Sequence, residues 1–187
     1  FTDIGLIAGK DLKIESRSRV LTNQVAPFAL MILVLFGIAL DADQQSLRNF
    51  ASGLFWISVL LCSLMAIARS MTIERDDEAL VGLNLSGVDP IAIFLGKTCA
   101  IAIQLLVLEI FLGVGIILLY RSEVEDVWLL VATGLFACIA VSALGTIFGF
   151  LASGLGVRET LLPILLLPLL LPVLIGATRA FDDALGV

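Results

Sequence analysis

Long apolar runs separated by short charged segments make up most of the chain. Each run is close to the roughly 20 residues that a helix needs to cross a ~30 Å hydrocarbon core. We therefore predict an all-α fold, a bundle of five membrane-spanning helices. Their expected positions are near residues 22–40, 50–68, 98–120, 127–153 and 160–178.

The first residues differ from these runs because apolar and charged positions alternate at helical spacing. Phe1, Ile4, Ala8 and Leu12 recur on one face, while Lys10 and other charged residues recur on another. This amphipathic, basic pattern predicts that 1–19 forms a helix lying along the lipid headgroups before the first span. A plain solvated helix is the alternative.

A charged loop, 69–96, separates the second and third predicted spans. Near its end, Asp89-Pro90 is a strong helix start, with Asp as the N-cap and Pro in the first turn. The third helix should therefore begin before the membrane. Lys97 would then extend its ammonium group to the membrane surface, as long basic side chains do near helix ends.

The same loop contains an apolar pair behind a run of acids. Acids in a first turn complement the helix dipole, so we predict a short amphipathic helix over about 74–84. The residues that define it are Glu74, Asp76, Asp77, Leu80 and Leu83.

Two later runs carry helix-packing signals. The fourth contains Gly145-Thr-Ile-Phe-Gly149, a small-xxx-small spacing that allows another helix to approach closely. On its own this motif is a weak signal. The fifth contains Pro163, Pro168 and Pro172, which remove backbone donors, so we expect that span to be broken or kinked and buried against its neighbours.

Composition supports membrane insertion, and the basic residues suggest an orientation. The chain is 60% hydrophobic and 15% charged, with a mean hydropathy of +1.12. If the spans alternate, most basic residues fall on the side of the N-terminus and the 69–97 segment, which should be cytoplasmic. The net charge of -6 indicates little about partners, and no basic patch for nucleic acid is present.

The chemistry of common membrane enzymes is missing from the sequence. There is no histidine, which removes histidine general bases and HExxH zinc sites, and Gly96-Lys97-Thr98 lacks the upstream Gly of a P-loop. Cys62, Cys99 and Cys138 have no C-x-x-C spacing, so we interpret them as buried apolar residues. We expect no catalytic residue, no bound metal and no ATP hydrolysis by this chain.

Glu109 is the one acid inside a predicted span, and Gln104 lies five residues before it. A carboxylate in the membrane is costly and marks a functional site by default. The alternative is a protonated Glu hydrogen-bonded to a neighbouring helix, which would hold the bundle together. The sequence leaves both open.

Three segments together resemble the CcmB family, membrane subunits of the ABC transporter for cytochrome c maturation. They are AGKDLKIESRSR, DDEALVGLNLSGVDPIAIFLGK and VRETLLPILLLPLLLPVLIGATRA. The loop departs from the family pattern at Glu78, Val81 and Gly87. The resemblance implies one ABC-2-type permease domain over 1–187. The family has a sixth span, which we expect to be missing at the C-terminus. We also expect a trimmed start and no cleavable signal peptide.

The resemblance also implies partners and a location. These are a CcmA-type ATPase that binds ATP, CcmC and CcmD-type membrane proteins and, indirectly, the CcmE-type heme chaperone, in the bacterial inner membrane. ATP hydrolysis in the family frees the heme-loaded chaperone from CcmC. Heme would be handled by the complex, with no cofactor bound by this chain. Without histidine, only Met, Cys or Tyr could ligate heme iron, so a mechanical role fits better.

In transporters of this type a cytoplasmic helix between two spans docks on the ATPase, which gives the 74–84 segment a function. An interfacial helix on lipid is the alternative, but acids are repelled by the anionic cytoplasmic leaflet. Two further hypotheses are a proton- or ion-coupled transporter or channel using Glu109 and Gln104, and a purely structural assembly subunit.

Overall fold

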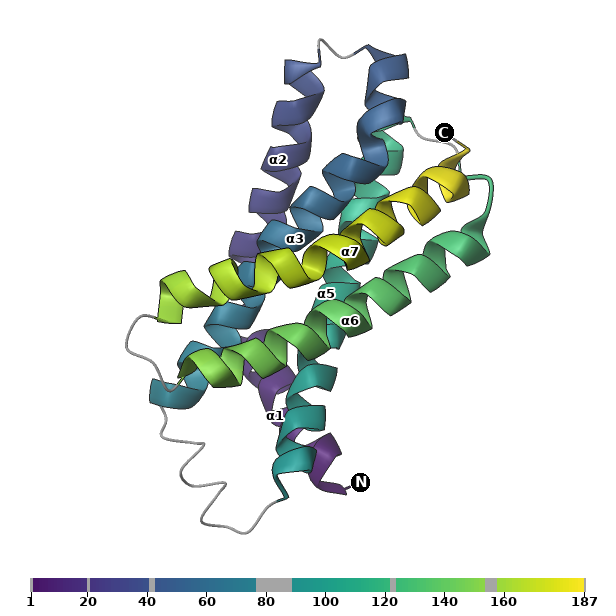
Figure 1. The fold of residues 1–187 in the computed structure, drawn as a ribbon. Helices are drawn as coiled ribbons and strands as arrows, with labels where there is room; N and C mark the ends of the chain where they lie inside the picture. Colours follow the sequence, from purple (N-terminus) through teal and green to yellow (C-terminus); the bar gives the residue numbers. More distant parts are fainter. Residues whose placement is uncertain are drawn as a thin grey trace.

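A computed structural model describes residues 2–19, 21–40, 43–76, 89–121, 124–153 and 158–186. These residues form helices and no strand, which confirms the all-α prediction (Figure 1). In chain order they are α1 (Thr2–Ser18), the π-helix η1 (Leu21–Val25), α2 (Ala26–Ala39), α3 (Gln44–Asp76), α5 (Pro90–Tyr120), α6 (Val127–Ser153) and α7 (Arg158–Leu185).

Among the described residues, 4 helices are long and apolar enough to cross a membrane, namely α3, α5, α6 and α7. A fifth span results if α1 and the η1–α2 segment, which meet at a bend of 51°, count as one. By itself α2 has 14 residues, about 21 Å, and is shorter than the hydrocarbon core. The chain is thus a multi-pass membrane protein built as a helical bundle.

The two longest described helices extend well past their apolar runs. α3 has 33 residues and α5 has 31, about 50 and 46 Å, so both extend well beyond a ~30 Å core. The helix that contains the predicted span near 50–68 continues through Arg69 to Asp76, so the 69–96 segment begins as helix. The backbone N–H and C=O groups of a helix hydrogen-bond to each other in water as well as in lipid. Polar side chains alone therefore do not end a helix.

The opposite end of α3 begins at a side-chain cap. The Ser46 backbone N–H donates to Asp43 Oδ2 at 2.9 Å, and the Leu47 N–H donates to the Asp43 carbonyl. These are the bonds of an N-cap residue. Hydrogen bonding to Ser46 holds the pKa of Asp43 below its ordinary value, so the cap's contribution is present above the unfolded pKa and is lost as pH falls.

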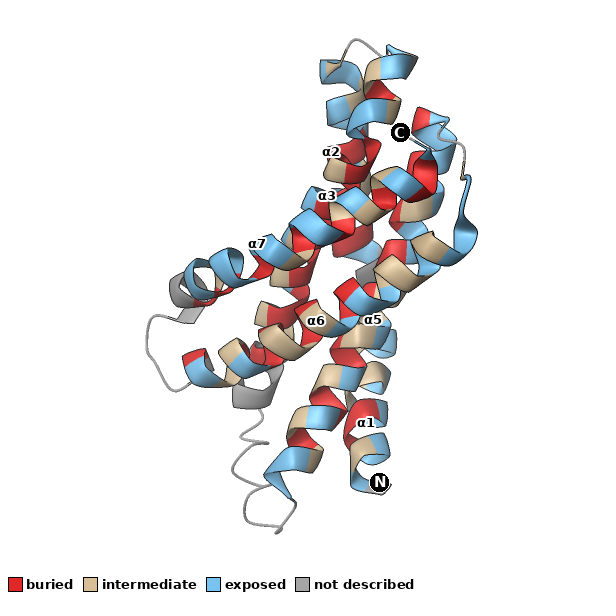
Figure 2. Ribbon diagram, turned by 45° about the vertical axis from the view of Figure 1, so that its right-hand side comes forward, coloured by how far each residue is buried: buried red, intermediate tan, exposed pale blue. Residues whose placement is uncertain are grey.

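The core lies where α3 and α5 are crossed by the other helices. The buried stripe of α5, residues at spacings of three and four, faces α3 and α6, whereas α6 and α7 expose their outer faces (Figure 2). In the first half of α3, Phe55 stacks on Phe181 of α7 with ring centroids 4.6 Å apart, and Trp56 packs edge-on against both rings. The outer apolar faces are suited to lipid.

The two glycines of the α6 motif pack against α3. A Cβ added at Gly145 would overlap the Ile67 side chain, and one added at Gly149 would lie 2.7 Å from Met71 Cε. Both contacts need the absence of a side chain, so the small-xxx-small spacing serves close packing within this chain, as predicted.

The prolines of α7 do not interrupt it, so of the two predicted forms, broken or kinked, the broken one is wrong. α7 is continuous from Arg158 to Leu185 with all three prolines inside it. Leu166 and Leu170 are buried against the bundle, while Pro168 and Pro172 are exposed. The backbone groups that these two prolines leave without a hydrogen bond therefore lie on the outer face of α7. Their missing bonds do not disturb the side that packs against the bundle.

Candidate functional site

The N-terminal end of the bundle is formed by α1, the last turns of α3 and the first turns of α5 (Figure 1). We call this the α1 end. Here α5 begins as predicted, because Asp89 is its N-cap, with Oδ1 accepting from the Ile91 N–H at 3.0 Å and Pro90 in the first turn. The predicted coupling segment connects α3 and α5 at this end.

The coupling residues are only partly described. Glu74 and Asp76 lie in the final turn of α3, so the described part of the predicted 74–84 helix belongs to α3. Asp77, Leu80 and Leu83 lie outside the described residues, and so do the family departures in the loop. Their proposed role stays a prediction.

Lys97 is buried against α1, and its predicted position at the membrane surface stays a prediction. Its side chain is 1% exposed, and its Nζ lies 3.3 Å from Asp11 Oδ2 on α1. The preceding Gly96 lets the two helices approach, because a Cβ there would lie 2.8 Å from Ile7 Cβ. Gly96 and Lys97 of α5 thus pack against α1, Gly96 beside Ile7 and Lys97 beside Asp11.

α1 is fastened to the bundle along one face. Ile7 and Ala8 are buried against α5, and Glu15 Oε2 lies 3.8 Å from Arg69 Nε on α3. The charged residues of α1 therefore include a set that faces protein, in addition to any that face headgroups. The predicted position of α1 along the lipid headgroups stays a prediction. The helix also packs against protein, through its contacts with α5 and α3.

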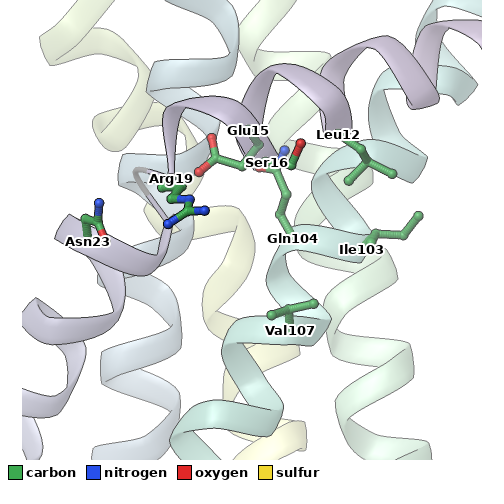
Figure 3. Close-up of a pocket in the computed structure, with 8 residues that line it drawn as sticks. All are labelled: Leu12, Glu15, Ser16, Arg19, Asn23, Ile103, Gln104 and Val107. Atoms are coloured by element: carbon green, nitrogen blue, oxygen red, sulfur yellow. The ribbon is translucent and has the colours of Figure 1, made fainter.

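Glu109 lies at the contact between α5 and α6. Its side chain is 7% exposed, and Oε1 is buried with no hydrogen-bond partner among the described residues. A Cβ on Gly134 of α6 would be only 3.0 Å from Oε2. Gln104 is on a different face of α5, in a groove beside α1 (Figure 3). Five residues correspond to about 140° of helical rotation, so the two polar groups are not brought together.

The arrangement of Glu109 leads to a prediction about stability. Because Oε1 is buried with no partner, its desolvation is uncompensated, and we expect Glu109→Leu to stabilise the bundle by about 1 kcal/mol. Glu109→Gln, which stays polar, should change stability little. Thermal unfolding in detergent measures both. A clear loss of stability in Glu109→Leu would instead mean that the carboxyl group holds the helices together.

The cysteines are placed mostly as expected. Cys62 and Cys138 are buried, and the Cys138 thiol approaches the Ala102 carbonyl at 3.1 Å, whereas Cys99 is exposed. Within the described ranges, no group of three or more Cys, Asp or Glu side chains could hold a metal ion. The buried thiols act as small apolar residues.

Comparison with known proteins identifies the family. The CcmB protein family matches residues 4–186, nearly the whole chain. The chain belongs to the CcmB family. A CcmB relative from Haemophilus influenzae, named heme exporter protein B, is 29% identical over 178 residues, 95% of this chain and 80% of the relative.

Two further relatives named heme exporter protein B are similar to the chain over most of its length. That of Rhodobacter capsulatus is 28% identical, with coverage of 97% of this chain and 84% of its own length. That of Escherichia coli K12 is 30% identical over 84% of this chain and 71% of its length. No solved structure matches the chain.

Sequence reasoning missed the Asp11–Lys97 contact. The signal was present, since Lys97 interrupts an otherwise apolar helix and Asp11 lies on an amphipathic one. A buried cation needs a counter-charge, so a lysine followed by a long apolar run could have been paired with an acid of α1.

Proposed function

We propose that this chain is the membrane component of a heme export system that serves cytochrome c maturation. The observation that carries the proposal is the CcmB match across residues 4–186, together with relatives named heme exporter protein B. A multi-pass bundle of apolar helices is the architecture that such a membrane component needs.

In this proposal the chain is a permease subunit and not an enzyme. A CcmA-type ATPase would bind and hydrolyse ATP, and CcmC and CcmD-type proteins would accompany it in the bacterial inner membrane, with the N-terminus cytoplasmic. The chain would move in response to ATP hydrolysis, and the complex would then act on a heme-loaded CcmE-type chaperone. The absence of histidine supports this mechanical role over direct heme ligation.

The α1 end supports a coupling role for the 69–96 segment. α3 and α5 are each about 15–20 Å longer than the hydrocarbon core, so helical extensions at this end can reach a partner outside the membrane. Both are tied to α1, by Arg69–Glu15 and Lys97–Asp11. A force applied to the loop would thus be transmitted to three helices at once.

The contacts do not favour a proton- or ion-coupled pathway. Such a pathway needs polar groups in succession, whereas Gln104 faces the α1 groove and Glu109 faces α6. We therefore keep one proposed function.

Deleting the gene tests the proposal. We expect c-type cytochromes, detected by their covalently bound heme in denaturing gels, to be lost and then restored by the wild-type gene. A b-type cytochrome signal, which needs no covalent attachment, serves as the control and should persist. Undiminished c-type cytochromes in the deletion strain would contradict the proposal.

A further inference from the structure

A groove of about 430 Å³ lies at the bend between α1 and η1, against the side of α5 (Figure 3). Its apolar lining consists of Leu12, Ile103 and Val107, and its polar lining includes Ser16, Arg19 and Gln104. Figure 3 shows the Gln104 side chain extending from α5 towards Ser16 of α1, with the Arg19 guanidinium further along the same wall of the groove. A cationic group and an amide therefore sit beside a hydrocarbon-like wall.

The groove lies close to the boundary between headgroups and hydrocarbon. α5 ends at Tyr120, followed by the exposed Arg121. Counting back the ~20 residues that cross a bilayer core places the other boundary near Ala100. Gln104 is thus about one helical turn inside that boundary and Val107 about two, and Arg19, at the bend after α1, lines the groove beside them.

The backbone fixes the position of Arg19. The Arg19 N–H donates to the Glu15 carbonyl at 2.8 Å, and the Arg19 carbonyl accepts from the Asn23 N–H at 2.8 Å, although Arg19 itself is left-handed with a φ of 51°. Hydrogen bonding therefore continues through the bend. Glu15 also lines the groove, and its carboxylate is 3.8 Å from Arg69 Nε, which offsets its charge.

We propose that this groove binds one anionic phospholipid, with its phosphate at Arg19 and Gln104 and an acyl chain along Ile103 and Val107. A guanidinium and an amide donate hydrogen bonds to phosphate oxygens, and the charged bond is the stronger one. Exposed apolar side chains of α5, at 39% for Ile103 and 54% for Val107, give the acyl chain a surface to cover. A free phosphate could use the polar half alone.

The test compares lipids on the purified full-length protein. Retention of phosphatidylglycerol and of phosphatidylcholine is measured by native mass spectrometry after delipidation and addition of each lipid. We expect selective retention of one phosphatidylglycerol, with Arg19→Gln weakening its apparent affinity about tenfold, the size expected for loss of a charged hydrogen bond. Thermal unfolding in phosphatidylcholine should be the same for both proteins.

Arg17→Gln is the matched control, because Arg17 is exposed in the last turn of α1, two residues before Arg19, and does not line the groove. It should keep wild-type affinity. Equal losses in Arg17→Gln and Arg19→Gln would overturn the proposal in favour of diffuse attraction to the basic N-terminal segment. Saturable stabilisation by inorganic phosphate alone, lost in Arg19→Gln, would also overturn it, since the apolar half would then be unnecessary.

Discussion

Asp11→Ala should lower the stability of the bundle by about 3–5 kcal/mol, the loss typical of removing one partner of a buried ion pair. The reason is the position of Lys97, which is 1% exposed and has its ammonium 3.3 Å from the Asp11 carboxylate. Removing the carboxylate takes away the acidic counter-charge that Asp11 gives to this buried ammonium group. Equilibrium unfolding in mixed micelles measures the loss.

The reverse truncation should cost less. In Lys97→Ala, Asp11 keeps Lys10 Nζ at 3.5 Å, and its side chain is already 10% exposed. Replacing both partners with apolar residues, as in Asp11→Leu/Lys97→Met, should recover most of the stability because no charge is left buried. If Asp11→Ala and Lys97→Ala are both within about 0.5 kcal/mol of wild type, the contact does not fasten α1 to α5.

The helices could be predicted from the sequence because apolar length is a direct consequence of bilayer thickness. Some of their ends could be predicted too, such as the start of α5 at its Asp89 cap, but the end of α3 could not. α3 continues to Asp76 because a helix needs no apolar side chains once outside the hydrocarbon core, and nothing between Arg69 and Asp76 breaks it. Likewise Pro168 and Pro172 suggested a broken helix, but proline breaks a helix only where the lost bonds cannot be tolerated, and here they face outward.

The candidate site was harder to predict, because it depends on which helices are neighbours. Glu109 was recognisable as an unusual acid from its position alone. That Glu109 lies next to Gly134 and apart from Gln104 depends on how α5 is rotated and which helices pack against it. The lengths of the apolar runs in the sequence do not specify either. Lys97 shows the same limit, since a lysine near a span end can face either headgroups or protein.

The segment between α3 and α5 is where we expect substitutions to change binding of the ATPase subunit. Replacing both Leu80 and Leu83 with Asp should abolish binding of the ATPase subunit while leaving the spans inserted. A helix that docks on a soluble partner must bury apolar side chains there, and two carboxylates in that interface would be desolvated without partners. The neighbouring acids Glu74, Asp76 and Asp77 would then set orientation through charge complementarity.

Ile91→Asp is the matched control for this pair. Ile91 is 64% exposed in the first turn of α5, at the same end of the bundle, and an acid there suits the helix dipole. The substitution adds negative charge close to the loop without changing the apolar stripe. ATPase binding should therefore survive in this variant.

The most direct test of the coupling account is the amount of ATPase subunit that co-purifies with the tagged full-length chain from its own membranes. We expect the wild type and Ile91→Asp each to co-purify with a stoichiometric amount of the ATPase. The Leu80→Asp/Leu83→Asp variant should lose the ATPase although the chain is present in the membrane at the same level. Retention of the ATPase by the double variant, with c-type cytochromes still formed, would contradict it.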